Sequence, residues 1–236
     1  RRIGPRNFFS GWLLDGGRVY YSLAEGTKDM EHLERALERA RLIGYDLLKT
    51  YVRLPDAAQK RALAAAHEMG IPTSSHEIFP AAATGMDAVE HASATSRRGY
   101  SPKMSLLGRV YDDVIEIVAK SGLNMTPTLV LPCFWPHLAA SPQVLENPAV
   151  QVFLSEAERQ SHLSRGESML TPATVARCAA TRSVSEIVAR GGRITAGTDS
   201  PIVPYGLALH VELQLLVEAG LSPFEALRSA TLWAAE

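Results

Sequence analysis

Short apolar runs alternate along the chain with longer segments whose apolar residues recur at helical spacing. Residues 28–42 show the helical period, and the run that follows, 45–52, alternates between the two faces of a strand. The same succession is repeated toward the C-terminus. The predicted strands are 45–52, 71–76, 86–91, 123–131 and 193–199. Because helices separate these runs, we expect the strands to be parallel, with helices covering the outside of the sheet.

The remaining segments complete an α/β pattern. Residues 4–26 are rich in glycine and aromatic residues and predict a strand with a loop. Further helices are predicted from Pro55 to Gly70, near Ala81, and over 109–120, 175–190, 207–220 and 223–235. The segment 132–174 contains several prolines and many polar residues, so we expect a long connection that serves as a lid or a mobile insertion.

Length and charge limit the possible classes of protein. With 236 residues, the chain fits one domain, 1–236, that buries a sizeable core. A formal net charge of -1 argues against nucleic acid and against an anionic membrane as partners. No apolar run is long enough to span a bilayer.

The two cysteines, Cys133 and Cys178, give neither a disulfide framework nor a paired metal-ligand spacing, so we expect free thiols without a special role. This leaves the compartment open, with the cytoplasm slightly favoured.

Four polar residues each end one of the predicted strands: Lys49, His76, His91 and Asp199. In alternating α/β folds the C-terminal ends of parallel strands meet on one rim, where active sites lie. A lysine, two histidines and an aspartate that converge there would form a site for a first-row metal. The pattern therefore favours hydrolytic chemistry.

Each of these residues also has a purely structural interpretation. A single buried histidine is more often a hydrogen-bonded core residue than a ligand. Lys49 lies within an apolar strand, where it must form an ion pair, face solvent, or lose its charge and react with carbon dioxide to give a carbamate. Asp199 could belong to a turn, although a carboxylate buried after an apolar strand needs a metal or a cation beside it.

Further candidates lie close to these strand ends. Tyr51 and His210 are expected to contact the substrate at the rim. Glu212, two residues after His210, is interpreted as a helix-capping, solvated residue. His137 and His162 reach the rim only if their long connection folds over it.

Several motifs together resemble the amidohydrolase superfamily, in its branch of imidazolonepropionase-like hydrolases and Xaa-Pro dipeptidases, which includes members fused to a β-propeller. The motifs lie at Arg2–Gly11, Ala65–His76, Ala88–Ala92, Ala196–Pro201, Leu209–Leu213 and Leu221–Thr231. The resemblance implies a (β/α)8 TIM-type barrel that runs here from the third strand to the last barrel helices, without the first strands and the companion β-sandwich.

The resemblance also implies roles for the four strand-end residues. Lys49 matches a lysine that is carboxylated in many members, and His76 and His91 match histidine ligands. Asp199 matches the aspartate that binds metal and carries the proton, so it is the catalytic candidate among the four metal ligands. The implied cofactor is zinc, as one or two divalent ions.

Two features depart from the family's pattern. The His-x-His of the first strand is absent, so metal binding by this chain alone is expected to be weak or lost, and six strands cannot close an eight-stranded barrel. Residues Glu77, Ile78 and Phe79 stand where small residues are common, which changes the shape expected for the substrate pocket.

The sequence thus predicts a metal-dependent hydrolase that cleaves a C–N bond in an amide, a peptide-like compound or a cyclic amide by means of metal-activated water. Its substrate would be a small molecule or dipeptide-like, and self-association into a homo-oligomer is left open. The alternative is a non-catalytic barrel remnant that binds a ligand or a partner, which the missing His-x-His favours.

Overall fold

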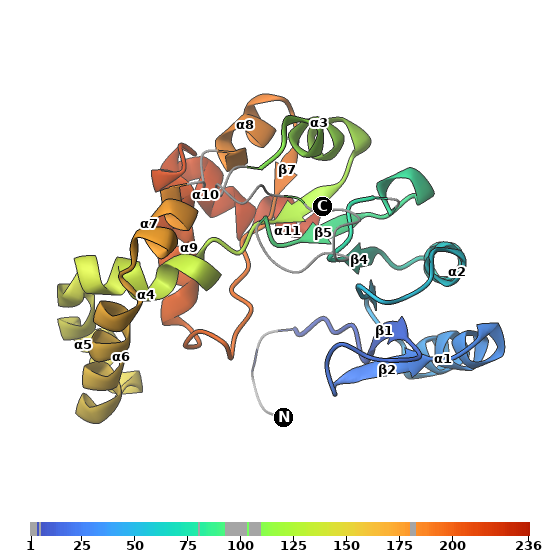
Figure 1. Ribbon diagram of the computed structural model, residues 1–236, viewed down its shortest axis with the longest axis horizontal. Coiled ribbons are helices and arrows are strands. Elements are labelled where there is room, and N and C mark those ends of the chain that lie inside the picture. Colours follow the sequence, from blue (N-terminus) through green and yellow to red (C-terminus); the bar gives the residue numbers. More distant parts are fainter. Residues whose placement is uncertain (1–3, 5, 80, 93–102, 104–109, 180–182) are drawn as a thin grey trace. The chain divides into compact units, whose positions relative to one another are not determined.

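The computed structural model describes residues 4, 6–79, 81–92, 103, 110–179 and 183–236. The chain divides into two compact units (Figure 1). Unit 1 comprises residues 1–90, 94–103 and 121–124, and unit 2 comprises residues 91–93, 104–120 and 125–236.

The strands form one seven-stranded sheet in the order β2-β1-β3-β4-β5-β6-β7. Their bounds are β1 Leu13–Gly16, β2 Ala24–Thr27, β3 Leu48–Thr50, β4 Thr73–Ser75, β5 Ala88–Glu90, β6 Asn124–Thr126 and β7 Arg193–Ile194. Among the described residues the sheet does not close into a barrel. The predicted α/β architecture, with an incomplete set of barrel strands, is thereby confirmed.

Strand pairing in unit 1 is parallel, as predicted. β1 pairs with both β2 and β3, β3 pairs with β4, and β4 pairs with β5. In the β3–β4 pair Lys49 lies opposite Ser74, and in the β4–β5 pair Ser74 lies opposite Ala88. The strands are shorter than their apolar runs. His76, His91 and Asp199 lie in the loops that follow β4, β5 and β7, whereas Lys49 lies within β3.

Two helices cover the sheet of unit 1: α1 (Met30–Ile43) and α2 (Asp56–Glu68). Asp29 caps the start of α1 by accepting a hydrogen bond from the His32 amide, and Gly44 ends the helix in a left-handed conformation. The core between these helices and the strands is aliphatic and alanine-rich, with Leu33, Leu37 and Leu48 fully buried. This core fixes the strands whose ends carry Lys49 and His76.

Most of the remaining chain is helical. The helices and 3₁₀ turns are η1 Ala82–Thr84, α3 Asp112–Ser121, α4 Val130–Ala140, η2 Pro142–Glu146, α5 Pro148–Phe153, α6 Glu156–Met169, α7 Pro172–Ala179, α8 Ser183–Ala189, α9 Leu207–Glu218, α10 Pro223–Ser229 and α11 Leu232–Ala235. In unit 2, helices α6, α7 and α9 pack against α4, and α5 packs against η2 (Figure 1). The cap predicted for α10 is confirmed, since Ser222 and Glu225 form a reciprocal capping box.

The prediction of a long irregular connection over 132–174 is wrong. This segment folds into α4, η2, α5 and α6, and the predicted strand 123–131 ends at Thr126. Its prolines do not break structure, because Pro142, Pro148 and Pro172 each begin a helical element. Proline has no amide hydrogen to lose at that position, so the same residues that suggest a loop serve as helix starts.

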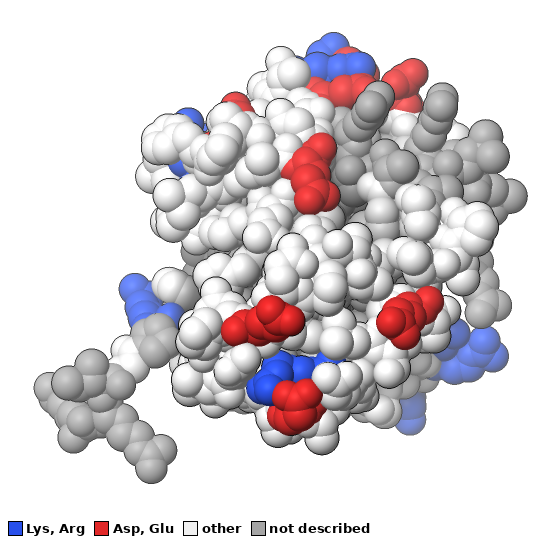
Figure 2. All heavy atoms as spheres, turned by 90° about the vertical axis from the view of Figure 1, so that its left-hand side faces the viewer, with Lys and Arg blue, Asp and Glu red and all other residues white. Residues whose placement is uncertain are grey.

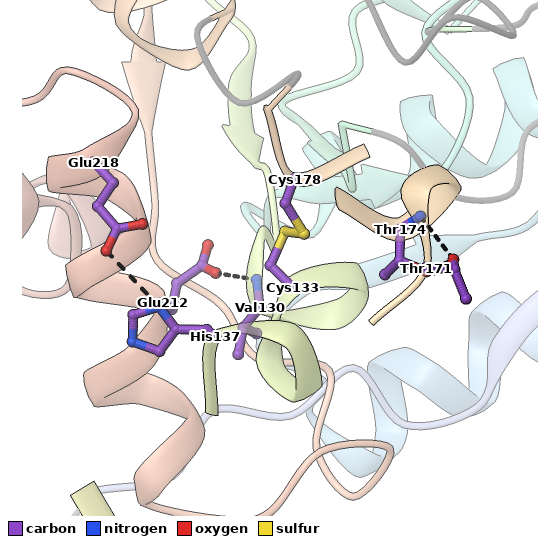
Figure 3. The surroundings of a disulfide bond; sticks show 8 residues. All are labelled: Val130, Cys133, His137, Thr171, Thr174, Cys178, Glu212 and Glu218. Atoms are coloured by element: carbon purple, nitrogen blue, oxygen red, sulfur yellow. Dashed lines mark hydrogen bonds and ion pairs between the residues drawn. A yellow bond between two sulfur atoms is a disulfide. The ribbon is translucent and has the colours of Figure 1, made fainter. Parts of the chain in front are cut away.

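The expectation of two free thiols is also wrong. Cys133 on α4 and Cys178 on α7 form a disulfide, with their Cα atoms 5.5 Å apart (Figure 3). Their separation of 45 positions in the sequence conceals this proximity. The bridge fastens α7 to the buried helix α4, whose residues Phe134 and Trp135 lie in the core.

In the part of the chain that the structure describes, no helix combines the length and the apolar character needed to cross a membrane.

Candidate functional site

Three non-glycine residues of the described chain adopt left-handed backbone conformations, and all three lie in unit 2. They are His91 (φ 59°), Thr128 (φ 51°) and Asp199 (φ 55°). A β-branched residue such as Thr128 rarely adopts this conformation, and strained backbone tends to cluster at active sites. Each of the three follows a strand, and two of them, His91 and Asp199, are candidates from the sequence.

Side-chain contacts join these three residues. The His91 Nδ1 atom lies 2.9 Å from Thr128 Oγ1, and its Nε2 atom lies 3.9 Å from Asp199 Oδ2. The His91 amide donates to the Thr126 carbonyl at 2.7 Å, which holds the backbone in place. The imidazole is buried, so Thr128 fixes the orientation in which its second nitrogen faces Asp199.

The side chain of Asp199 is 39% exposed, which corrects the expectation of a buried carboxylate. The segment that leads to it passes very close to β6, because an added Cβ at Gly197 would lie only 2.4 Å from Thr126 Cγ2. The hydroxyls of Thr126 and Thr195 are 2.8 Å apart and tie the two segments together. Asp199 therefore stands beside His91 on a closely fixed backbone, with an accessible carboxylate.

In unit 1, the predicted ligand Lys49 forms an ion pair. Its Nζ atom lies 3.4 Å from Glu90 Oε1, and the Ser74 hydroxyl also donates to this carboxylate oxygen. Both charged side chains are largely buried. This is the structural role weighed above for a lysine in an apolar strand, and Glu90 is the partner that the sequence did not identify.

A second lysine, Lys103, lies against the same group of residues. It is buried, and its ammonium donates to the His76 carbonyl at 2.9 Å and to the Glu90 carbonyl at 2.5 Å. Burial lowers the pKa of Lys103 to about 7, against the opposing effect of Glu90 and Glu77. No sequence pattern marks Lys103 as a candidate, because it follows no periodic segment.

The predicted ligand His76 and the predicted substrate contact Tyr51 are neighbours in unit 1. Their ring centroids are 4.5 Å apart, and both residues are buried. Tyr20 and Tyr21 pack against Tyr51 at 5.8 and 5.5 Å. Of the bulky residues after His76, Glu77 and Ile78 are buried, so only Phe79 projects to the surface.

The donor chemistry of the candidates suits a divalent metal only in part. Imidazole nitrogen and carboxylate oxygen are zinc ligands, and the 3.9 Å between His91 and Asp199 is within the roughly 4 Å that two such bonds of about 2.0–2.2 Å span. Across the described residues, no group of three or more histidine, cysteine, aspartate or glutamate side chains could hold a metal ion. His91 and Asp199 belong to unit 2 and Lys49 and His76 to unit 1, and the meeting of all four stays a prediction.

A pocket of about 660 Å³ lies in unit 2 next to the segment that follows Asp199. Its walls come from α4 to α6, from residues 201–207 and from His210 on α9. His162 of α6 also lines it, so the segment that the sequence presented as a loop brings His162 close to His210. The pocket's size is typical of small-molecule sites.

The fit of α6 against α4 sets one wall of this pocket. An added Cβ at Gly166 would lie 2.7 Å from the Trp135 carbonyl oxygen and 3.3 Å from Ala139 Cβ. The Trp135 ring lies 4.4 Å below the Arg165 guanidinium and 5.2 Å from the His162 ring. Figure 2 shows unit 2 from the side of α5 and α6, where Lys, Arg, Asp and Glu are scattered rather than gathered in one patch.

Glu212, which we interpreted as a solvated capping residue, caps a helix but is fully buried. Its carboxylate accepts a hydrogen bond of 2.7 Å from the Val130 amide at the start of α4 (Figure 3). Burial raises the pKa of Glu212 to about 7, although the Val130 and Leu129 amides act in the opposite direction. Its second oxygen has no hydrogen-bond partner among the described residues.

Comparison with solved structures identifies the fold. The chain is similar to a Xaa-Pro dipeptidase with methionine bound in its active site (TM-score 0.57, 17% identity, 89% of this chain and 48% of that chain). It is also similar to a bottromycin amidohydrolase (TM-score 0.64, 20% identity, 95% and 53%) and to the ochratoxinase of A. niger (TM-score 0.64, 16% identity, 98% and 54%).

These neighbours are members of the amidohydrolase superfamily, so the resemblance predicted from the motifs is confirmed at the level of the fold. The chain spans about half the length of the solved structures it matches. No model of a protein family matches the sequence, and no curated protein does.

Proposed function

We propose that this chain carries part of the catalytic centre of a metal-dependent hydrolase that cleaves a C–N bond. The observation that carries the proposal is the cluster of left-handed residues, His91, Thr128 and Asp199, whose side chains contact one another at the ends of strands. The fold shared with the dipeptidase, the amidohydrolase and the ochratoxinase supports hydrolysis of an amide, a peptide-like compound or a cyclic amide.

Asp199 is the proposed proton carrier. Its carboxylate is accessible to a water and to a substrate, and it faces the buried imidazole of His91. In this role it accepts a proton from the attacking water and returns it to the leaving nitrogen. Thr128 holds the His91 ring, so that the nitrogen facing Asp199 keeps one position throughout.

Zinc, as one or two ions, is the proposed cofactor. His76, His91 and Asp199 would hold it, with Lys49 joining them as a carbamate. When bound, such an ion supplies hydroxide from water at neutral pH and polarises the carbonyl oxygen of the substrate. Lys49 must leave Glu90 to take this role, so Glu90 competes with carboxylation for the lysine.

Tyr51 and His210 are the proposed substrate contacts. His210 lines the pocket beside the segment that follows Asp199, which supports its role. Tyr51 is buried against His76, so a direct contact would have to come from the edge of its ring or from its hydroxyl.

The proposal is tested on the full-length protein by measuring metal content and hydrolysis of a panel of dipeptides and N-acylamino acids. We expect stoichiometric zinc and turnover of at least one amide. Absence of both in a folded protein would reject the proposal.

The rival function, a binding module without catalysis, is favoured by the Lys49–Glu90 ion pair, which occupies the lysine without a metal. It predicts that ligands bind to the full-length protein while no amide is cleaved at any metal concentration.

A further inference from the structure

The pocket of unit 2 has a mainly apolar lining. Eleven of its fifteen lining residues have apolar side chains or are glycine, and the other four are Glu158, His162, Arg165 and His210. Phe153, Ile202 and Tyr205 expose much of their apolar surface at this place. A cavity of this size and lining removes a ring or a large aliphatic group from water, which favours binding.

Trp135 provides the flat surface in this pocket. It is buried on α4, and the His162 ring lies 5.2 Å from it at an angle of 42°. Because burial lowers the pKa of His162, its ring is mainly neutral at pH 7 and serves as an aromatic wall. The close packing at Gly166 holds α6 against α4, so these rings keep their places without a ligand.

The charge at the pocket comes from Arg165. Its guanidinium lies over the Trp135 ring, and within the described part of the chain no carboxylate forms an ion pair with it. The one acidic lining residue, Glu158, already accepts hydrogen bonds from the amide and the hydroxyl of Ser155. The pocket therefore presents an available cation beside an apolar chamber, which is complementary to a carboxylate that carries a large apolar group.

The lining of the pocket also includes residues that follow the proposed proton carrier, Asp199, closely in the sequence. Pro201 and Ile202, two and three residues after Asp199, form part of its lining, and His210 forms another part. The Ile202 amide also donates a hydrogen bond of 3.2 Å to the Asp199 carbonyl, so this part of the pocket wall lies beside Asp199 in space as well as in sequence.

We infer that this pocket binds the aromatic, carboxylate-bearing part of the substrate, with the aryl group among the apolar side chains and the carboxylate at Arg165. The inference rests on the proposed function, because it assigns the substrate class of that same site: amides in which the part bearing the aromatic ring also carries a free carboxylate.

Binding of two small probes to the full-length protein tests the inference without catalysis. The probes are 3-phenylpropionate and its neutral amide, 3-phenylpropionamide, titrated by calorimetry and by tryptophan fluorescence. We expect the acid to bind roughly tenfold more tightly than the amide, because a hydrogen bond to a charged group contributes on the order of this factor. Arg165→Gln should abolish that difference and leave the affinity for the amide unchanged.

Arg190→Gln is the matched control. It removes the same charge from unit 2, at an exposed position paired with Glu116 and outside the pocket lining. It should leave both affinities unchanged. A second variant, Ile202→Glu, places a carboxylate in the pocket wall and should weaken binding of the acid by more than tenfold. Thermal melting of each variant verifies that it is folded.

Equal affinities for the acid and the amide, or an Arg165→Gln variant that still prefers the acid, would overturn the inference. Failure of the proposed function has a different signature. In that case 3-phenylpropionate binds through Arg165, which supports the pocket, while no amide is hydrolysed. Conversely, a protein that cleaves aliphatic amides and does not bind 3-phenylpropionate retains its proposed function and contradicts the aromatic pocket.

Discussion

The Nε2 atom of His91 lies 3.9 Å from Oδ2 of Asp199, although 108 positions separate the two residues (199 minus 91). The distance exceeds that of a direct hydrogen bond, and the two side chains are held at it by left-handed backbone at both residues. A left-handed backbone costs free energy at both residues, so it persists only because the surrounding structure imposes it. The pair is therefore the best-defined part of the candidate site.

Replacement of Asp199 by asparagine tests the proton carrier. Asp199→Asn keeps the size of the side chain and removes its charge, so we expect kcat to fall by about 10²–10⁴-fold with a much smaller change in KM. Steady-state kinetics on whichever amide the full-length protein cleaves provides the measurement. Asp112→Asn, at the start of α3, is the control and should retain full activity. Normal turnover by the Asp199 variant would assign the proton transfer to another group.

The two interpretations of Lys49 are separated by metal analysis. If Lys49 binds metal as a carbamate, Lys49→Ala should lose metal and activity, and acetate or propionate should restore part of both. Glu90→Gln should retain metal, because it only frees the lysine from its ion pair. If Lys49 serves only to pair with Glu90, both variants will keep the metal content of the parent protein. Elemental analysis of the three proteins decides between these outcomes.

A single methyl group at Gly197 is expected to destabilise unit 2. In Gly197→Ala the new Cβ would lie 2.4 Å from Thr126 Cγ2, so we expect a loss of about 1–3 kcal/mol in the free energy of unfolding. Urea denaturation measures it. Gly17→Ala is the matched control, since an added Cβ there would lie at an ordinary van der Waals distance, 3.5 Å, from its nearest atom, Lys28 Cα.

Combining Gly197→Ala with Thr126→Ser should recover part of this loss, because serine lacks the clashing methyl and keeps the hydroxyl that contacts Thr195. Purely additive effects of the two substitutions would contradict the proposed clash.

Glu212 should make stability depend on pH. Burial raises the pKa of Glu212 from its ordinary value of 4.5 to about 7, so between these two pH values the folded state binds a proton that the unfolded state has lost. The contribution of Glu212 to the free energy of unfolding is therefore fully present below about pH 4.5. It is lost as the pH rises through 7, and the total loss is about 3 kcal/mol.

Glu212→Gln should flatten this part of the profile, since glutamine still accepts the Val130 amide and cannot ionise. Denaturation of both proteins between pH 5 and 8 provides the comparison. Parallel profiles would show that Glu212 does not titrate in this range.

The sequence predicted the sheet better than the helices of unit 2. Apolar runs that end in Lys49 and His76 coincide with parallel strands, because strand period and burial depend on local pattern. Prolines at 142 and 148 misled the assignment of the next segment, because a proline signals either a loop or a helix start. Only the tertiary packing, of α6 and η2 on α4 and of α5 on η2, decides between them. The Cys133–Cys178 bridge depends on that same packing.

The candidate site was predictable where it lies at strand ends and not elsewhere. His91 and Asp199 are marked by the runs that precede them, and the structure brings them together. Thr128 could not be identified, because nothing in its sequence neighbourhood signals a left-handed backbone. Arg165 and Lys103 act through contacts with residues distant in the chain, on which local periodicity carries no information.

Gly166 suggests how the substrate range of such a protein can diverge. The absence of a side chain there allows α6 to approach the Trp135 carbonyl, and this approach sets the width of the pocket. A lineage that exchanged this glycine for alanine or serine would push α6 outward and change the chamber without altering His91, Thr128 or Asp199. Specificity and chemistry would thus be inherited separately, and new substrates could be acquired in the helices while the strand ends remained the same.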